Sequence, residues 1–477
     1  MVARCALTCG LCVAALFLTG TACAQDEPGE GGEESSQTII DELADSIADS
    51  LSPRWAGPRR PWPERRDRPT TAGVVRSVES PIALHVGEGV LPEDADEALE
   101  ALEYAHRWLE SNDWPTPLPD GGAGGTGETD VYLAYGLAGE GERLAFSSYD
   151  AAVPWLGTDA ATTFAGIDAG VDAGRLTACV VSAYVQASLL SSDPAEANGW
   201  RVATGDYLAW LLTGQFGCSD AGLVAHQRAG GRTWVGSASD SGEGGALFLA
   251  LLSARTDGLS GRFIRDIWSG APQRTWDGDE LRASPDLWEV LNVVMDIGDD
   301  PLQRLIEEMG VARYFIGDAG RRAGAPIPLL RTLPSEASVR VLGRTRYEEL
   351  PRRFEPRGLE LEAYGSAYVE VDVSEAEPGS QLRIWLRGEI GVAWSLTAVR
   401  LAEDGSERGR VRAPVRLLTP RAYVPLEITD EETHSVLIVV TNLGSRLVDA
   451  DTSDEQVRSF RLILDREDDA DDAGVPD

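Results

Sequence analysis

Cys179-Val-Val-Ser-Ala-Tyr-Val-Gln186 is the stretch of sequence on which the fold of this chain is decided. It lies inside a predicted helix over residues 175–190. Ser182 and Gln186 are four positions apart, so they lie on one face of that helix, and Ala183 follows Ser182 directly. The elements predicted on either side of this helix define the domain that contains it.

Those elements indicate an α+β domain. The strands are expected at 81–86, 130–135 and 162–167, and the helices at 93–109, 175–190, 200–213, 244–255, 261–268, 285–295 and 301–308. A few strands followed by a block of helices is an order typical of the α+β class.

A second, strand-rich domain is predicted after the helical block. Val369, Val371 and Val373 alternate with Tyr368 and acidic residues, which is the period of a half-buried antiparallel strand. Residues 436–440 are continuously apolar and predict a central strand. Several short strands separated by turns are typical of an antiparallel β-sandwich.

The domain order follows from these patterns. We expect an export signal at 1–24, a disordered tether with one short helix at 25–75, the α+β domain at 76–325, a connecting segment at 326–362, the β-sandwich at 363–465 and a disordered acidic tail at 466–477.

The N-terminus has the features of an export signal, because Arg4 is followed by an apolar run over residues 11–18 and then by small residues. Two endings are open: cleavage after Ala24, or a lipoprotein site at which Cys23 is acylated. The apolar run is shorter than the roughly 20 residues of a membrane span. We therefore expect an exported protein without a transmembrane span, which is periplasmic, anchored to the outer membrane through Cys23, or extracellular.

The predicted tether contains two distinct segments. Apolar residues recur at every fourth position from Ile39 to Leu51, which predicts one short amphipathic helix. Residues 54–68 are rich in arginine, proline and tryptophan. They are either a basic-aromatic binding segment or a proline-stiffened linker whose arginines lie on the acidic body of the protein, and we favour the linker.

The charge of the chain excludes some partners. Its 477 residues carry a net charge of −36, from 78 acidic residues against 42 basic ones, all of them arginine. Binding to nucleic acid requires a positive field, so nucleic acid is not expected as a partner. Anionic lipid is excluded as a docking surface by the same argument.

The cysteines suggest a single disulfide bond. Cys179 and Cys218 remain after the export signal is removed. Two cysteines in an exported protein most often form a disulfide, and the alternative is a pair of buried thiols. They are too few to form a zinc site of their own.

Several segments together resemble a family of secreted bacterial metalloproteases of the gluzincin type. They are the strand and helix at 81–111, the Gly-rich loop and strand at 120–133, the helix at 177–190, the helix opening on Trp200, the segment 241–252 and the strand opening at 364–371. The resemblance implies a zincin-like domain with its zinc-binding His-Glu-x-x-His motif on helix 177–190 and a glutamate ligand from the next helix.

The positions that this resemblance assigns to catalysis are vacated. Ser182 and Gln186 stand where the two histidines belong, Ala183 replaces the general base, and Ala203 replaces the third ligand, with Asp206 as the nearest carboxylate. Serine and glutamine are poor zinc ligands, and alanine cannot transfer a proton. We therefore expect no zinc, no other cofactor and no metal-assisted hydrolysis.

Three functions remain open. The first is a non-catalytic protein that binds an unknown peptide or protein in the old active-site cleft, lined by Ser182, Gln186, Asp206, Tyr207 and His226. The second is a hydrolase that uses a non-standard metal site, for example from Asp206 and His226, or a pair of carboxylates. The third is a structural or adhesive surface protein that acts through the β-sandwich.

Overall fold

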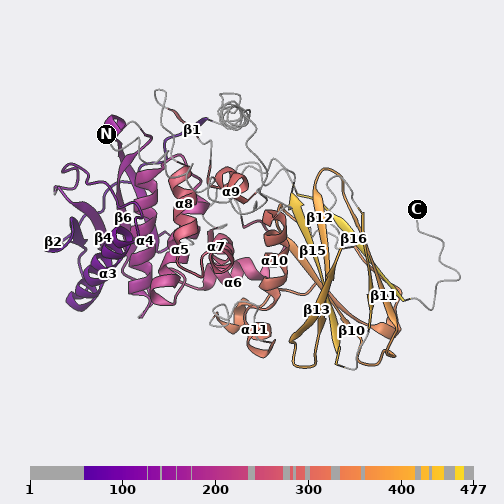
Figure 1. Cartoon of the computed structure of the whole chain (residues 1–477). Coiled ribbons are helices and arrows are strands. Elements are labelled where there is room, and N and C mark those ends of the chain that lie inside the picture. The colour runs from indigo at the N-terminus through magenta and orange to yellow at the C-terminus, as the bar shows by residue number, and fades with distance from the viewer. Residues whose placement is uncertain are drawn as a thin grey trace, which may run out of the picture. The chain divides into compact units, whose positions relative to one another are not determined.

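The computed structural model describes residues 59–466 apart from 126, 140–141, 157, 173, 235–241, 272–279, 283–285, 296–300, 324–332, 356–359, 414–420, 429–431 and 445–456. The predicted export signal, Cys23, the amphipathic helix and the acidic tail from residue 467 lie outside the described residues. Within them, helices and strands form an α+β fold, as the sequence predicted (Figure 1).

A five-stranded mixed sheet forms the first part of the fold. Its order is β2 (Gly73–Arg76), β3 (Ile82–Val86), β4 (Thr129–Ala134), β6 (Ala161–Asp168) and β5 (Ala145–Ala152). Strands β3, β4 and β6 are parallel, whereas β2 and β5 run antiparallel to their neighbours. The parallel strands are almost wholly buried, as parallel strands covered on both faces usually are.

One face of this sheet packs on two helices, α3 (Pro92–Ser111) and α4 (Leu176–Ser192). Leu84, Leu133 and Ile167 point from the sheet into their shared core. Helix α4 is buried along nearly its whole length, because α3, the sheet and the next helix enclose it.

The remaining helices continue from α4 towards the C-terminal domain. They are α5 (Asn198–Thr213), α6 (Ala221–Arg228), α7 (Gly242–Thr256), α8 (Arg262–Gly270), α9 (Leu287–Met295), α10 (Pro301–Tyr314) and α11 (Asp318–Ala323). Helix α5 packs between α4 and α7, and α10 contacts both α7 and the strands of the second domain. No helix in the described ranges is long and apolar enough to cross a membrane.

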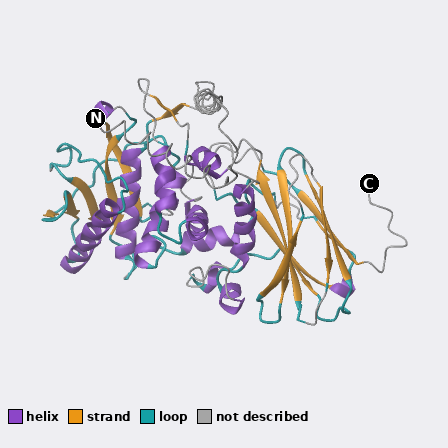
Figure 2. Ribbon diagram, viewed as in Figure 1, coloured by secondary structure: helices purple, strands orange, loops and turns teal. Residues whose placement is uncertain are grey.

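The C-terminal domain is a sandwich of two sheets (Figure 2). One sheet has the order β13 (Glu407–Arg412), β12 (Ala393–Leu401), β15 (Ser435–Gly444), β10 (Ser366–Asp372) and β8 (Gly343–Arg346). The other has the order β14 (Arg421–Glu427), β11 (Gln381–Gly388), β16 (Phe460–Arg466) and β9 (Arg352–Phe354). Val369, Ile438, Ile384 and Leu462 meet in the core between the sheets, so the predicted sandwich is confirmed.

Two details of this domain correct the sequence analysis. Strands β8 and β9 fall inside residues 326–362, which were expected to form a connecting segment, but both strands pair within the sandwich. Tyr368 was expected on a half-exposed face. It is buried because α10 covers that face, where Tyr368 Oη donates a hydrogen bond to Gly310 O at 2.9 Å.

The predicted disulfide between Cys179 and Cys218 is confirmed. It connects α4 to the segment that follows α5, so two adjacent buried helices are joined covalently. The bond closes a loop with a sequence separation of 39 residues.

Loss of this bond is expected to destabilise the domain. A loop of this length corresponds to about 3–4 kcal/mol in the chain-entropy model. Urea denaturation of the Cys179→Ala/Cys218→Ala variant should show a loss of that size, and the reduced wild-type chain should show a similar loss. Equal stability of the oxidised and reduced chains would contradict this role.

Candidate functional site

A chain of buried polar side chains occupies the position at which the resemblance places a metal. Gln186 Nε2 donates a hydrogen bond to Ser182 Oγ at 2.9 Å, and Ser182 Oγ donates one to Asp206 Oδ1 at 2.7 Å. Arg143 Nη2, from the loop before β5, is 2.7 Å from Asp206 Oδ2. The chain therefore connects this loop, α5 and α4.

In this arrangement the hydroxyl of Ser182 is not available to react with a substrate. Its hydroxyl donates to a carboxylate and accepts from an amide, and the side chain is fully buried. The helices also touch here, because a Cβ added to Gly205 of α5 would lie 2.8 Å from Gln186 Cγ and from Ser182 O. The polar chain provides hydrogen-bond partners for the polar groups that α4 and α5 bury against each other.

The other predicted site residues point elsewhere. Ala203 faces α7, where a Cβ on Gly245 would lie 2.8 Å from Ala203 Cβ. The hydroxyl of Tyr207 faces Ser253 of α7, and burial raises the pKa of this tyrosine. The predicted third-ligand position is thus turned towards α7, and Asp206 is the carboxylate that reaches Ser182.

His226 also lies against α7. A Cβ on Gly244 would nearly coincide with its ring, at 2.1 Å from His226 Nε2. Burial, followed by the charges of Arg313 and Arg232, holds the pKa of His226 well below its usual value. The five predicted cleft residues are all buried and do not line one surface. Across the described ranges, no three His, Cys, Asp or Glu side chains are grouped so that they could hold a metal ion.

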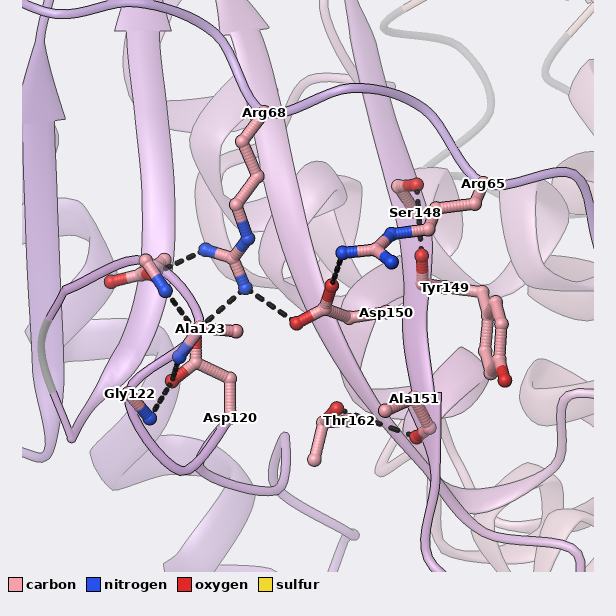
Figure 3. Close-up of polar contacts among 12 residues, drawn as sticks. Arg65, Arg68, Asp120, Gly122, Ala123, Ser148, Tyr149, Asp150, Ala151 and Thr162 are labelled. Carbon is pink, nitrogen blue, oxygen red and sulfur yellow. Dashed lines mark hydrogen bonds and ion pairs between the residues drawn. The ribbon is translucent and has the colours of Figure 1, made fainter.

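A second polar site lies on the opposite face of the five-stranded sheet, and the sequence did not predict it. A strap, residues 62–70, crosses this face and inserts Arg68 among three aspartates (Figure 3). Arg68 Nη2 is 2.6 Å from Asp120 Oδ2 and 2.7 Å from Asp150 Oδ2, and Arg68 Nη1 bonds to Asp130. The three aspartate side chains are almost completely buried.

Neighbouring groups hold these carboxylates in place. Asp120 Oδ1 accepts hydrogen bonds from the backbone N–H groups of Gly122 at 2.8 Å and Ala123 at 3.2 Å, so the Gly-rich loop wraps around it (Figure 3). His85 Nε2 is 2.7 Å from Asp130 Oδ1. Burial raises the pKa of Asp120, and the nearby Asp130 adds to this effect. The Gly-rich loop thus serves as a tight turn around a carboxylate.

The rest of the strap follows strand β5. Arg65 pairs with Asp150 at 2.8 Å, the guanidinium of Arg66 lies 4.4 Å from the ring centre of Phe146, and Trp62 packs on Tyr149 at 4.8 Å between ring centres. In the described part of this segment the arginines lie on the body of the protein, as the favoured interpretation expected, but the segment is packed against the sheet and does not form a separate linker. The predicted boundary at residue 76 is too late, because packed structure already includes the strap and β2.

A third cluster lies in the turn between α4 and α5. Asp193 accepts hydrogen bonds from the N–H groups of Ala195 and Glu196, and Glu196 accepts them from Ala197 and Leu287. Burial, together with the charge of Asp159, raises the pKa of Asp193 to about 7. Burial, together with the charge of Asp193, raises the pKa of Glu196 to about 7. All four of these carboxylate contacts are to the backbone, so the pair shapes the turn.

Removing Arg68 is expected to destabilise the fold strongly. Arg68→Gln removes the cation that three buried carboxylates share, although Arg65 still pairs with Asp150, and loss of such a cation typically costs about 3–5 kcal/mol. The loss should shrink at acidic pH, because protonation then neutralises the carboxylates. Urea denaturation at pH 8 and pH 5 measures both effects.

Arg65→Gln is the matched control for this prediction. The side chain of Arg65 is 59% exposed although it contacts the same Asp150. Its loss should therefore change the free energy of unfolding by only about 0–1 kcal/mol. Equal effects of the two substitutions would contradict the proposed role of Arg68.

The Asp193–Glu196 cluster is expected to make stability depend on pH. The folded-state pKa values, about 7, lie above the unfolded values of about 4. The folded state therefore binds more protons, and this stabilisation is complete below about pH 4 and lost as the pH rises through 7. The free energy of unfolding should decline less steeply between pH 5 and 8 in the Asp193→Asn variant, with a slope smaller by up to about 1.4 kcal/mol per pH unit. Urea denaturation across this pH range measures the slope. Asp404→Asn, at an exposed turn, should leave the slope unchanged.

No family model and no curated protein matches this chain. Among solved structures, the chain is similar to part of an insecticidal delta-endotoxin, Cry8Ea1, from Bacillus thuringiensis, with 14% sequence identity and a TM-score of 0.13. The similarity covers 24% of this chain and 19% of the toxin chain. A similarity of this extent carries no argument about fold or function.

Proposed function

We propose that this protein is an exported, non-catalytic protein with a metalloprotease-like scaffold and that it binds an extended peptide or protein segment along strand β5. Export is supported by the N-terminal sequence pattern, which leaves a periplasmic, outer-membrane-anchored or extracellular location open. The absence of catalysis is supported above all by the Arg143–Asp206–Ser182–Gln186 chain. These side chains form hydrogen bonds with one another at the position where the resemblance would place a metal.

The proposed binding element is the edge of the first sheet. Strand β5 is the last strand in the order and pairs only with β6 among the described strands. An edge strand presents N–H and C=O groups to which an extended segment can add as a further strand. Main-chain pairing of this kind requires no catalytic residue.

Arg143 is well placed to contribute to such binding. It lies two positions before the first residue of β5, and its side chain is 22% exposed. Asp206 accepts a hydrogen bond from one side of the Arg143 guanidinium and so fixes the orientation of this group. A guanidinium has five N–H donors, and this one lies at the start of the edge strand. We therefore expect Arg143 to contact the bound segment.

A binding experiment with random peptides tests this proposal. Decapeptides selected by phage display on the full chain should protect the amides of residues 145–152 from hydrogen exchange. Arg143→Ala should weaken their binding about tenfold, the loss expected for one charge-assisted hydrogen bond. Arg175→Ala is the matched control, since its side chain is 20% exposed and is also paired with an aspartate.

Two results would reject the proposal. Selected peptides that protect other segments and bind the Arg143→Ala variant normally would remove β5 as the binding element. One tightly held zinc per purified chain, with peptide hydrolysis that Asp206→Ala abolishes, would instead establish the hydrolase alternative.

A further inference from the structure

The strap begins on the helical side of the five-stranded sheet. Tyr149 of β5 is directly opposite Thr163 of β6, and Thr163 Oγ1 donates a hydrogen bond to Ala187 O of α4 at 3.0 Å. Residues opposite each other on neighbouring strands have their side chains on the same face. Tyr149 therefore lies on the face that α4 covers, and Trp62 of the strap packs on its ring there.

The strap reaches the other face of the sheet within four residues. Arg66 N donates a hydrogen bond to Ser148 Oγ at 3.0 Å, and Ser148 directly precedes Tyr149 in β5, so their side chains point to opposite faces. Figure 3 shows that the side chains of Tyr149 and Asp150 also leave β5 in opposite directions. Residues 62–66 therefore pass around the edge of β5.

This crossing lies where a bound segment would pair. Strand β5 spans Ala145–Ala152, and the strap passes it at Ser148 and Tyr149, near the middle. A further strand can add to a sheet edge only where the main-chain groups of that edge are accessible. A segment that pairs along the whole of β5 therefore requires residues 62–66 to move aside.

The two parts of the strap are held with unequal strength. The side chains of Arg65 and Arg66 are 59% and 44% exposed in their ion pairs, and exposed pairs of this kind contribute little. Arg68 is only 14% exposed and contacts three almost completely buried aspartates. Residues 62–66 can therefore lift from β5 while Arg68 stays in place.

We propose that residues 62–66 are a gate that regulates the binding of an extended segment at β5. In the closed state, which the structure shows, the gate crosses the edge of the strand. In the open state, it exposes the main-chain groups of β5 along their whole length. This inference rests on the function proposed above. The measured affinity for a segment is then its intrinsic affinity reduced by the fraction of molecules in which the gate is open.

Weakening the closed state should strengthen peptide binding. Trp62→Ala/Arg65→Gln removes the ring contact with Tyr149 and the ion pair with Asp150. The open fraction should rise, so Kd for decapeptides selected on the full chain should fall about tenfold. Fluorescence anisotropy of labelled decapeptides measures this Kd. Because Arg68 is unchanged, Tm should stay close to that of the wild-type chain.

Trypsin cleavage after Arg66 measures the opening of the gate directly. In the free protein, the Trp62→Ala/Arg65→Gln variant should be cleaved there faster than the wild-type chain, because an open gate is more accessible to a protease. Saturating decapeptide without arginine or lysine should speed this cleavage in the wild-type chain, since the bound peptide holds the gate open.

Matched controls come from the second domain. Trp385 stacks on Tyr423 of the neighbouring strand at 4.1 Å between ring centres, and Arg408 is 44% exposed in its pair with Glu432. Trp385→Ala/Arg408→Gln therefore removes the same two kinds of contact away from β5. This variant should keep the wild-type Kd and the wild-type rate of cleavage after Arg66.

An unchanged or higher Kd in the Trp62→Ala/Arg65→Gln variant would overturn the gate, and so would unchanged cleavage after Arg66. If residues 145–152 are protected by peptide and Arg143→Ala weakens binding, such a result rejects the gate alone. If residues 145–152 are not protected, binding at β5 and its regulation by the gate are both rejected.

Discussion

The burial of helix α4 is the constraint on which the rest of the first domain depends. Because the sheet, α3 and α5 enclose this helix, each polar group on it must find its partner inside the protein. Ser188 Oγ bonds to Pro115 O, and Ser191 Oγ donates to Ala161 O at 2.6 Å. Ser182 and Gln186 are satisfied by each other and by Asp206. This burial therefore demands that the polar side chains of Ser182, Gln186 and Asp206 form a closed chain of hydrogen bonds.

Buried carboxylates in the first domain are paired mainly with arginines. Arg68 compensates three aspartates on one face of the first sheet, and Arg143 compensates Asp206 on the other. Arg313 is held differently. Its guanidinium donates to Gln227 Oε1 at 2.7 Å and to the backbone carbonyls of His226 and Gly230. Burial lowers its pKa. Arg313 thereby ties α10, which covers the sandwich, to α6 in the helical block.

The proposed binding element and the buried polar chain differ in physical character. Strand β5 provides main-chain groups at a sheet edge, where recognition depends on an extended backbone. The Ser182, Gln186 and Asp206 side chains form hydrogen bonds with one another inside the protein. Peptide binding at β5 therefore requires no change in the packing of α4 against α5.

Periodicity and composition were sufficient for much of this architecture. The alternating valines at 369–373 and the continuous apolar run at 436–440 predicted the sandwich, because one buried face imposes a period of two. The helices at 175–190 and 200–213 and the disulfide between Cys179 and Cys218 were also predictable. Strand β5, with the sequence Ala-Phe-Ser-Ser-Tyr-Asp-Ala-Ala, was missed because it has no clear alternation. Strands β8 and β9 were missed because they are only four and three residues long.

The sequence by itself determined that α4 carries no histidine, aspartate or glutamate, so neither a base nor two histidine ligands can stand at the position where the resemblance would place a metal. Only the tertiary structure decided what occupies that position. Asp206 rather than Ala203 reaches Ser182, because the rotation of α5 turns Ala203 and Tyr207 towards α7. The Arg68 cluster was likewise invisible in the sequence. It brings together residues that are far apart in the chain, and strand register and packing alone determine which of them meet.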